Sequence, residues 1–501
     1  MRATSSGSHA RFGRCATANV RAQNGRRADR FTPARQHRVS AGRGGHTPNA
    51  RRAPRPGGGA FVKRQGREPV STHVSDDKLV IRGGRPLSGT IIPSGNKNAA
   101  LPILAACLLT DEEVVLENVP DILDVHAMLA LLDDLGVDIR DAGPNALALR
   151  AARVRTTELD PELCRRLRAS LLLAGPLLAR CGAVDLPLAG GDFIGRRRVD
   201  THLLAFRALG AVCEVERSYR LRSTGLSGAD IFLDEASVTA TENALMAAVL
   251  APGRTLIWNS ACEPHVQDLA RFLVELGARI EGIGTNLLTI TGVERLTGGR
   301  FTIGPDHIEI ASFIGLGAIT GSDLTIPDVR PDDLRMINLT FERLGIRVEI
   351  DGTTLRVPPD QDLRVVSDAG DAIPKIDDGI WPAFPADLTS IATAVATQTH
   401  GTVMIFEKMF ENRLFFVDKL VAMGARIILC DPHRAVISGP AQLYGERLES
   451  PDIRAGMAML IASLAASGTS TIGNVGQIDR GYERIDERLR AVGADIERIH
   501  E

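Results

Sequence analysis

An internal repeat is the feature of this 501-residue sequence that most restricts its fold. Six times, an apolar helical stretch ends at a glycine and continues into a short β-rich run. The glycines are Gly136, Gly210, Gly277, Gly345, Gly424 and Gly493, at intervals of 74, 67, 68, 79 and 69 residues. Glycine commonly takes the left-handed conformation that ends a helix. Six copies at nearly constant spacing therefore predict six copies of one α/β unit.

Each unit also contains a second helix, upstream of the glycine turn and built mainly from small and apolar residues. Such helices are predicted at 98–109, 168–179, 241–251, 388–398 and 453–466. A helix that is apolar almost all round is typical of one buried on every side. Strands are predicted after several of them, at 113–119, 254–260 and 401–407. Units of this length do not fit short helical repeats such as ankyrin, so we expect two domains of three units each.

The first 75 residues differ in composition from the rest. They contain sixteen Lys and Arg against two acidic residues, a formal charge of +14, whereas the remainder carries −16. Because they hold few apolar residues, residues 1–75 are predicted to be a disordered Arg-rich tail. A targeting segment, a nucleic-acid-binding tail and a start placed too far upstream stay open as alternatives. The acidic body argues against a nucleic-acid role outside this tail.

Several common kinds of site are missing from the sequence. Seven cysteines are scattered without a CxxC pair, which favours free thiols in a reducing compartment over a disulfide framework or a zinc site. There is neither a GxxxxGK[ST] phosphate loop nor a GxGxxG after a strand, and no convincing transmembrane stretch. We therefore expect a cytoplasmic protein that uses no metal and no cofactor.

Two glycine-containing motifs bring charged residues to predicted helix starts and loops. PSGNKNAALP (93–102) sets Lys97 in the first turn of a helix, where backbone N–H groups attract anions. A lysine in the first turn is unfavourable for the helix dipole, so a bound anion would explain the presence of Lys97 better than an exposed, solvated side chain does. GGDFIGRRRVD (190–200) sets Asp192 on a glycine-rich loop before three arginines. A mobile surface loop with a charge run is the alternative for this second motif.

Four further motifs contain an acid or an arginine next to apolar elements. WPAFPADL (381–388) leads to Asp387, which alternatively caps the following helix. Arg413 lies in FENRL, Arg454 in DIRAG and Arg480 in QIDRGYERI, where a surface ion pair is the alternative for Arg480. Scattered cations beside two isolated acids indicate a polyanionic small substrate and acid–base chemistry.

In this combination, SGNKNAALP, GGDFIGRR, FPAD, FENR and IDRGYERI resemble the UDP-N-acetylglucosamine 1-carboxyvinyltransferases, enolpyruvyl transferases, from about Lys78 to Glu501. The resemblance implies a two-domain inside-out α/β barrel built from six βαβαββ-type repeats. The first three-repeat domain would span 97–305, and the second 76–96 plus 306–501. The implied reaction transfers the enolpyruvyl group of phosphoenolpyruvate to the 3-hydroxyl of UDP-N-acetylglucosamine by addition and elimination, releases phosphate, and begins peptidoglycan synthesis.

The resemblance also implies roles for individual residues. Asp387 matches the proposed base, Asp192 the general acid, and Lys97 a further catalytic residue. The phosphoenolpyruvate site would consist of Lys97, Asn98, Arg197, Arg413, Arg454 and Arg480. The nucleotide sugar would contact Arg168, Arg197, Arg198, Val199, Asp200, Thr201, Glu235, Ala236, Ser237, Val238, Asp387 and Met409. These two small molecules are the only partners expected, with neither nucleic acid nor membrane.

Some positions depart from the family pattern. Most members carry cysteine where this chain has Asp192, and because a carboxylate is a poorer target for epoxides than a thiolate, resistance to fosfomycin is expected. Arg198 and Thr201 replace residues of a usual Pro-Val-Asp-Leu run, and Glu235 stands where a lysine is frequent. A shikimate-type enolpyruvyl transferase, and a catalytically silent paralogue that binds the nucleotide sugar, remain as alternatives.

Overall fold

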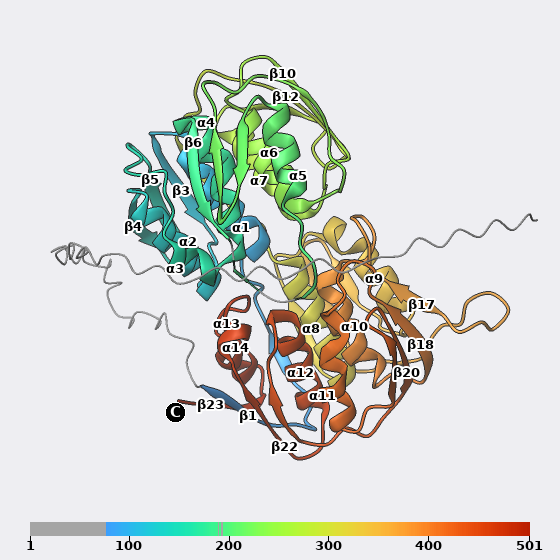
Figure 1. Ribbon diagram of the computed structural model, residues 1–501. Coiled ribbons are helices and arrows are strands. Elements are labelled where there is room, and N and C mark those ends of the chain that lie inside the picture. The colour runs from blue at the N-terminus through green and yellow to red at the C-terminus, as the bar shows by residue number, and fades with distance from the viewer. Residues whose placement is uncertain (1–76, 189, 192–193, 501) are drawn as a thin grey trace, which may run out of the picture. The chain divides into compact units, whose positions relative to one another are not determined.

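The computed structural model describes residues 77–188, 190–191 and 194–500 (Figure 1). The tail predicted at 1–75 and the acid predicted at Asp192 lie outside the described residues. No helix in the described part of the chain is long and apolar enough to span a bilayer.

Six small sheets make up the β structure of the described residues, one for each predicted repeat. Five have four strands with the same pairing, in which the first pair is parallel and the next two pairs are antiparallel. In one continuous copy the strands lie in the order β17 (Lys375–Asp377), β18 (Gly401–Phe406), β20 (Arg434–Gly439) and β19 (Ile427–Asp431).

The other sheets repeat this order with their own strands. They are β9 (Asp230–Phe232), β10 (Arg254–Trp258), β12 (Leu287–Thr291) and β11 (Arg279–Glu281); β13 (Gly299–Thr302), β3 (Glu113–Glu117), β5 (Ala146–Arg150) and β4 (Asp138–Gly143); β2 (Ser88–Thr90), β14 (Asp323–Ile326), β16 (Thr354–Val357) and β15 (Glu349–Asp351); β21 (Arg447–Glu449), β22 (Thr469–Gly473), β1 (Lys78–Arg82) and β23 (Asp495–Ile499); and the three-stranded β6 (Ala183–Pro187), β8 (Ser218–Arg222) and β7 (Val212–Val215). A parallel bridge between Glu158 and Asp185 stands where the sixth sheet has no first strand. The common order confirms the sixfold repeat.

The six glycine turns are also confirmed. The φ angles of these glycines lie between 77° and 105°, in the region that side chains disfavour. Each glycine follows a helix and precedes the strand that lies last in its sheet's spatial order. The helices are α2 (Leu123–Asp134), α5 (Asp200–Ala208), α7 (Pro264–Glu275), α9 (Arg335–Glu342), α11 (Val417–Ala422) and α14 (Ile485–Ala491).

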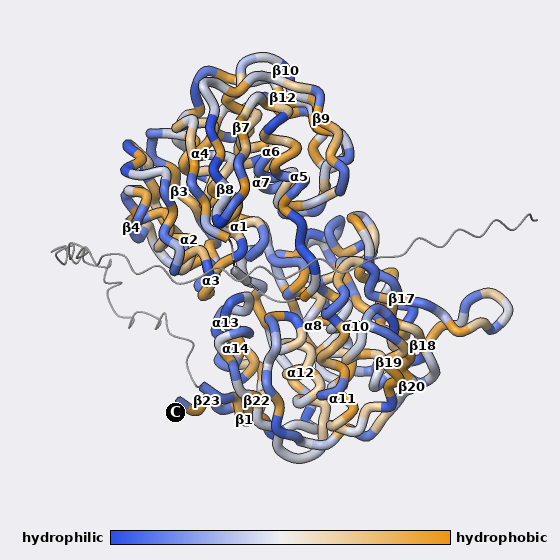
Figure 2. The backbone as a smooth tube through the Cα atoms, in the orientation of Figure 1, coloured by the Kyte–Doolittle hydropathy of each residue, from blue (hydrophilic) through white to orange (hydrophobic). Residues whose placement is uncertain are grey.

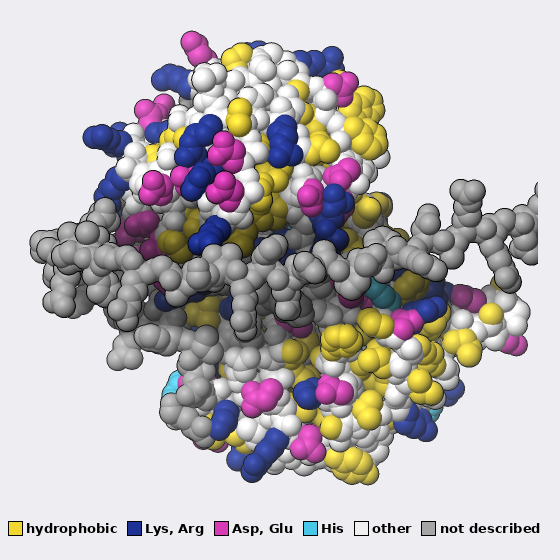
Figure 3. Space-filling view, in the orientation of Figure 1, with side chains coloured by type: hydrophobic (Ala, Val, Ile, Leu, Met, Phe, Trp, Pro, Cys, Tyr) yellow, Lys and Arg dark blue, Asp and Glu magenta, His cyan; other side chains and the backbone are white. Residues whose placement is uncertain are grey.

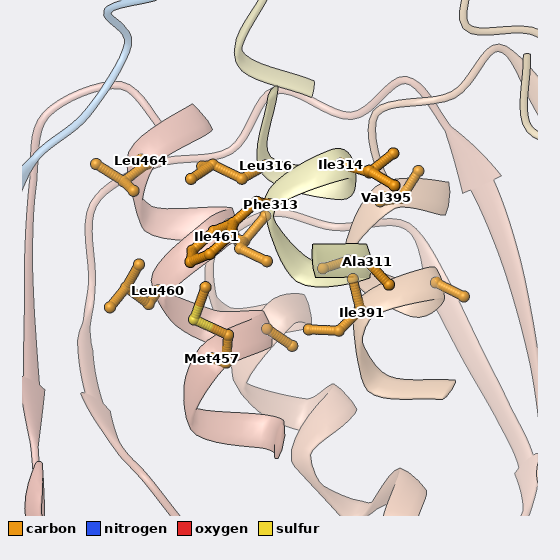
Figure 4. Close-up of a cluster of buried hydrophobic side chains, with 14 of the residues drawn as sticks. Ala311, Phe313, Ile314, Leu316, Ile391, Val395, Met457, Leu460, Ile461 and Leu464 are labelled. Carbon is orange, nitrogen blue, oxygen red and sulfur yellow. The ribbon is translucent and has the colours of Figure 1, made fainter. Parts of the chain in front are cut away.

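The second helix of each unit is buried, as its composition predicts. The side chains of α8 (His307–Thr320), α10 (Thr389–Ala396) and α12 (Ile453–Ala465) pack against one another and against the strands around them. Figure 4 shows Phe313, Ile391 and Ile461 from the three helices meeting in one cluster. The apolar residues of α12 can be followed as orange segments in Figure 2. Helices inside and sheets outside form the predicted inside-out α/β arrangement.

A second buried cluster is built in the same way between residues 99 and 303. Its central helices are α1 (Lys97–Ala106), α4 (Ala174–Cys181) and α6 (Val238–Ala248). The single helix predicted at 168–179 is wrong, because a 3₁₀ helix at Arg168–Leu173 comes before α4. Pro176 accounts for the break, because proline has no N–H to donate to the carbonyl of the residue four positions earlier, Leu172. The three helices remain largely buried in spite of this interruption.

Two chain segments connect the two sets of units. β2 pairs with β14 and leads to α1, whereas β13 pairs with β3 and leads to α8. The segments run antiparallel: the Asn96 N–H donates to the Gly304 carbonyl (2.8 Å), and the Asp306 N–H donates to the Ser94 carbonyl (2.9 Å). The helix starts at both ends are capped alike, α1 by the Asn96 side chain and α8 by that of Asp306. The Asn96 side chain thus caps α1, directly before Lys97.

The packing of the central helices leads to a first prediction. Leu316 on α8 is completely buried, whereas Leu339 on α9 is 56% exposed. Leu316→Ala should lower the free energy of unfolding by about 2–5 kcal/mol, because it leaves a cavity between helices. Leu339→Ala, the matched control, should change it by less than about 0.5 kcal/mol. Urea denaturation followed by circular dichroism measures both, and equal effects would contradict the packing described.

Candidate active site

One cavity of about 280 Å³ gathers most of the residues selected from the sequence. Its lining comes from both sets of units, and the crossing segments bring Lys97 and His307 to it. On the face shown in Figure 3, basic and acidic side chains are intermingled, whereas six cations converge on this cavity. The predicted residues that line it are Lys97, Asn98, Arg168, Arg197, Val238, Asp387, Met409, Arg413, Arg454 and Arg480.

Asp387 is held between two arginines. The Arg413 Nη2 donates to its Oδ1 (2.9 Å), and the Arg454 Nε donates to its Oδ2 (3.0 Å). The side chains of Arg413 and Arg454 are only 3% and 4% exposed, whereas 28% of the Asp387 side chain remains exposed. Asp387 lies within a short 3₁₀ helix and makes no cap for α10, so the alternative of a simple helix cap is wrong. The carboxylate belongs to the cavity instead.

The charge of Asp387 is strongly stabilised. Burial works to raise the pKa of this carboxyl, but the positive charges of Arg454, Arg413 and Lys97 outweigh burial and hold its pKa well below the usual range. Asp387 is therefore ionised at neutral pH. It is also a weak proton acceptor as long as these arginines are turned toward it, because a low pKa means low basicity.

The two arginines are themselves held rigidly. The Arg454 guanidinium lies 5.5 Å from the centre of the Tyr482 ring, and that of Arg413 lies 5.3 Å from the Phe410 ring. Asp452 accepts hydrogen bonds from the N–H groups of Arg454 (2.8 Å) and Ala455, which places Arg454 in the first turn of α12. Such restraint keeps positive charge facing the cavity without the entropy cost of ordering a long side chain.

Asp124 is a site residue that sequence reasoning missed. It lies in the first turn of α2 and is 3% exposed. Its Oδ2 is 3.0 Å from Lys97 Nζ, and its Oδ1 accepts from Arg480 Nε at 2.8 Å. Burial opposes the charge of Asp124, but Lys97 and Arg480 outweigh burial and lower its pKa. The alternatives of a solvated lysine and a surface arginine pair are thus wrong. Acidic residues are common at helix starts, so the sequence alone could not single out Asp124.

The residues selected for nucleotide-sugar contact are only partly at the cavity. Arg168 donates to the Arg197 carbonyl (2.7 Å), and both line the cavity together with Val238 and Met409. The following residues do not line it: Arg198, Val199, Asp200, Thr201, Glu235, Ala236 and Ser237.

Arg198 and Thr201, the two residues that differ from the usual Pro-Val-Asp-Leu sequence of the family, both bind the carboxylate of Asp234. Arg198 Nη2 donates to Asp234 (2.8 Å), and Thr201 Oγ1 donates to the other oxygen of the same carboxylate (2.7 Å). Among the arginines that follow the glycine-rich motif, the Arg196 N–H donates to the Glu411 side chain (3.1 Å).

Several buried polar residues at the cavity were also not anticipated. Glu242, Glu263, His265 and His307 line it. Glu242 had a signal in the sequence, since it is the only charged residue in the apolar run TENALMAAVLA. Burial lowers the pKa of His265 to about 3 and that of His307 to about 4. In the described part of the chain, no group of three or more His, Cys, Asp or Glu could hold a metal ion.

Solved structures with the same architecture identify the class of protein. The enolpyruvyl transferase NikO from Streptomyces tendae matches with a TM-score of 0.75 and 25% identity, over 85% of this chain and all of that one. EPSP synthase from Acinetobacter baumannii matches over the same share with a TM-score of 0.66 and 17% identity, which supports the fold alone. The family profile of EPSP synthase (3-phosphoshikimate 1-carboxyvinyltransferase) matches residues 81–489. The fold is that of the enolpyruvyl transferases.

Sequence relatives narrow the class to one family. UDP-N-acetylglucosamine 1-carboxyvinyltransferase from Bradyrhizobium diazoefficiens is 57% identical over 424 residues, 85% of this chain and 98% of the relative. The protein of that name from Treponema denticola is 55% identical over 84% of this chain and 99% of its own length. The chain belongs to the UDP-N-acetylglucosamine 1-carboxyvinyltransferase family, as the sequence motifs predict.

The buried histidines lead to a prediction about pH. Burial lowers the pKa of His202 and of His265 to about 3 and that of His307 to about 4. In the unfolded chain they titrate near ~6.5, so below that pH the unfolded state binds more protons than the folded state. The three histidines together should therefore lower the free energy of unfolding by about 4 kcal/mol per pH unit near pH 5, whereas carboxyls whose pKa is raised in the folded state, such as Glu242, oppose this fall.

Urea denaturation at several pH values measures this slope. His202→Gln should reduce it by about 1.4 kcal/mol per pH unit, the contribution of one proton. A variant slope equal to that of the wild-type protein would contradict a neutral, buried His202.

Proposed function

We propose that this chain transfers the enolpyruvyl group of phosphoenolpyruvate to the 3-hydroxyl of UDP-N-acetylglucosamine and releases phosphate, an alkyl- or aryl-transfer reaction that begins peptidoglycan synthesis. The observation that carries the proposal is the convergence of six cations on one cavity around the ionised Asp387. Both substrates are anionic, and the reaction needs only a base, an acid and stabilisation of charge. Full-length relatives of the same name support the choice of substrates.

Phosphoenolpyruvate is proposed to bind at the cationic side of the cavity. Lys97, Asn98, Arg197, Arg413, Arg454 and Arg480 supply donors for its phosphate and carboxylate. Two of these cations share Asp124 and two share Asp387, so each carboxylate prevents uncompensated repulsion until the substrate arrives. Lys97 and Arg480 reach the cavity from elements far apart in sequence.

Asp387 is proposed as the base for the sugar hydroxyl. Its low pKa makes it a weak base beside Arg413 and Arg454 alone. The phosphate and carboxylate of bound phosphoenolpyruvate would offset these positive charges and raise the basicity of Asp387. The hydroxyl oxygen then bonds to C2 of phosphoenolpyruvate as C3 takes a proton. Loss of a C3 proton and of phosphate from this tetrahedral adduct gives the enolpyruvyl ether.

Asp192 is proposed as the acid for C3. Aspartate ordinarily titrates near about 3.9 and cysteine near about 8.5, so Asp192 needs a raised pKa to donate a proton near neutral pH. Bound phosphate would raise it, whereas arginines would lower it. Proton donation by Asp192 should therefore depend more on bound substrate than donation by the usual thiol does.

The nucleotide sugar is proposed to extend from Asp387 toward Arg168, Arg197, Val238 and Met409. The segments 198–201 and 235–237 would contact the nucleotide outside the cavity. Their common neighbour is Asp234, held by Arg198 and Thr201. Since these two residues depart from the family run, the uracil contacts are proposed to be reorganised around this acid.

Two further features of the protein remain proposals. The two three-repeat domains are proposed at 97–305 and at 76–96 plus 306–501, supported by the two separate buried clusters. A cytoplasmic location without nucleic-acid or membrane partners is proposed from the chemistry, because both substrates are charged small molecules.

The first test of this function is turnover of the two substrates. Wild-type protein should release phosphate from phosphoenolpyruvate only when UDP-N-acetylglucosamine is present. Asp387→Asn and Lys97→Ala should reduce this rate by about 10²–10⁴-fold, as loss of a positioned acid–base or charged group does. Asp418→Asn, at an exposed ion pair on α11, is the matched control and should retain the wild-type rate.

Two outcomes of this assay would favour the alternatives. Faster phosphate release with shikimate 3-phosphate would indicate the shikimate-type enzyme. Calorimetric binding of UDP-N-acetylglucosamine, with equally slow release by wild type and variants, would indicate a silent paralogue.

A second test concerns the acid at position 192. Fosfomycin alkylates a nucleophilic thiolate, and a carboxylate is a much weaker nucleophile toward epoxides. The wild-type protein should show no time-dependent loss of activity with fosfomycin, whereas Asp192→Cys should be inactivated progressively. Asp192→Ser, which has no thiol, is the control. Inactivation of wild type as fast as of Asp192→Cys would contradict the role given to Asp192.

A further inference from the structure

Besides atoms of Arg413 and Arg454, three buried polar atoms at the cavity have no hydrogen-bond partner among the described residues. They are Oε1 of Glu242, Oε2 of Glu263 and Nδ1 of His265. Glu242 is 1% exposed and His265 is 7% exposed, and all three residues line the cavity. A buried polar atom without a partner costs free energy, so its retention beside a cavity indicates a ligand that completes its hydrogen bonding.

These side chains are fixed in place by their surroundings. Glu242 lies within the buried helix α6, and Glu263 is the residue before Pro264 at the start of α7. The His265 ring stacks on that of His307, with centroids 6.3 Å apart and planes 12° apart. His307 Nδ1 is 3.1 Å from the Asn96 amide nitrogen. We call Glu242, Glu263 and His265 the polar face of the cavity. Because its side chains are already fixed in place, this face is suited to binding a ligand.

The face differs in charge from the rest of the cavity. Burial raises the pKa of Glu242 well above its ordinary value, with Glu263 adding to the effect, and burial also raises the pKa of Glu263. Burial keeps His265 neutral. The cations described above therefore suit phosphate and carboxylate groups, whereas this face suits uncharged groups that donate and accept hydrogen bonds.

The position of the face relative to Asp387 indicates which ligand group it meets. Asp387 is close enough to His265 for its negative charge to act on the pKa of that imidazole. The hydroxyl that reacts beside Asp387 belongs to a hexose whose other substituents are a hydroxymethyl group, a hydroxyl and an acetamido group. A group one or two ring atoms away from the reacting hydroxyl would point along the same wall of the cavity.

We propose that Glu242, Glu263 and His265 bind an uncharged polar substituent of the amino sugar, its acetamido group or the neighbouring ring hydroxyl, and thereby determine sugar specificity. The proposal rests on the proposed function, because it names the part of that substrate the face recognises. It assigns the three residues to specificity rather than to proton transfer. Sites that hydrogen-bond a substrate group discriminate strongly against analogues without it, since their own polar atoms are then left unpaired.

The test compares Michaelis constants for the two substrates. Glu242→Met keeps the shape of the side chain but removes both oxygens, and should raise the KM for UDP-N-acetylglucosamine at least 10-fold. The KM for phosphoenolpyruvate should change less than twofold. Glu242→Gln, which keeps a donor and an acceptor, should restore most of the loss. Glu275→Gln, on the exposed side of α7, is the control and should behave as wild type.

Two sugar-nucleotide analogues identify the group that is bound. If the face binds the acetamido group, the effect of Glu242→Met on kcat/KM disappears with UDP-glucose, which lacks that group. If it binds the 4-hydroxyl, the effect persists with UDP-glucose and disappears with UDP-N-acetylgalactosamine, in which that hydroxyl is inverted. An effect of equal size on all three sugars, or one that falls on phosphoenolpyruvate, overturns the proposal.

A second variant guards against misfolding of the first. His265→Phe retains a ring to stack on His307 but removes Nδ1, and should give the same selective rise in KM. A normal KM in both Glu242→Met and His265→Phe would also overturn the proposal. The proposed function fails separately, since in that case wild-type protein itself would not turn over UDP-N-acetylglucosamine.

Discussion

The fold depends on the need to cover helices that are apolar on every side. No single unit of one small sheet and two helices can bury such a helix, because one face would remain in water. Three units together can bury their helices, because the inner helices pack against one another and the sheets enclose them. The helices α8, α10 and α12 are packed in this way. Repetition is thus a physical requirement of the composition. It also explains why the inner helices are rich in alanine and glycine, since helices in close contact leave little room for large side chains.

A second constraint is the concentration of positive charge in a partly buried cavity. Six cations would repel one another without compensation. Asp387 offsets Arg413 and Arg454, and Asp124 offsets Lys97 and Arg480. The same carboxylates keep the cations oriented toward the cavity in which we propose that the anionic substrates bind. For Asp387 this arrangement has a chemical consequence, because the arginines that keep it ionised also weaken it as a base until a substrate takes up their charge.

The cavity is chemically divided. The cations occupy one part, and the buried side chains of Glu242, Glu263 and His265, each with an atom that lacks a hydrogen-bond partner among the described residues, occupy another. A substrate pair that combines several negative charges with a neutral, polar sugar matches this division. In the roles proposed above, charge provides affinity for both anions, whereas hydrogen bonding by these buried groups discriminates between sugars that carry the same charge.

The sequence by itself determined the repeat, the class of fold and most of the cation set. A glycine that must adopt a positive φ and a helix that is apolar all round leave local signals, and motifs such as FENRL preserve arginines in a recognisable context. The tertiary structure decided which charges neutralise one another. Asp124 binds both Lys97 and Arg480, although Arg480 lies 356 positions further along the chain. No local pattern distinguishes Asp124 from the acidic residues that ordinarily occur at helix starts. It also decided that Asp387 is no helix cap, that Asn96 caps α1, and that Glu242 faces a cavity rather than a packed core. These features depend on long-range packing, because burial and pairing are properties of surroundings that distant parts of the chain supply.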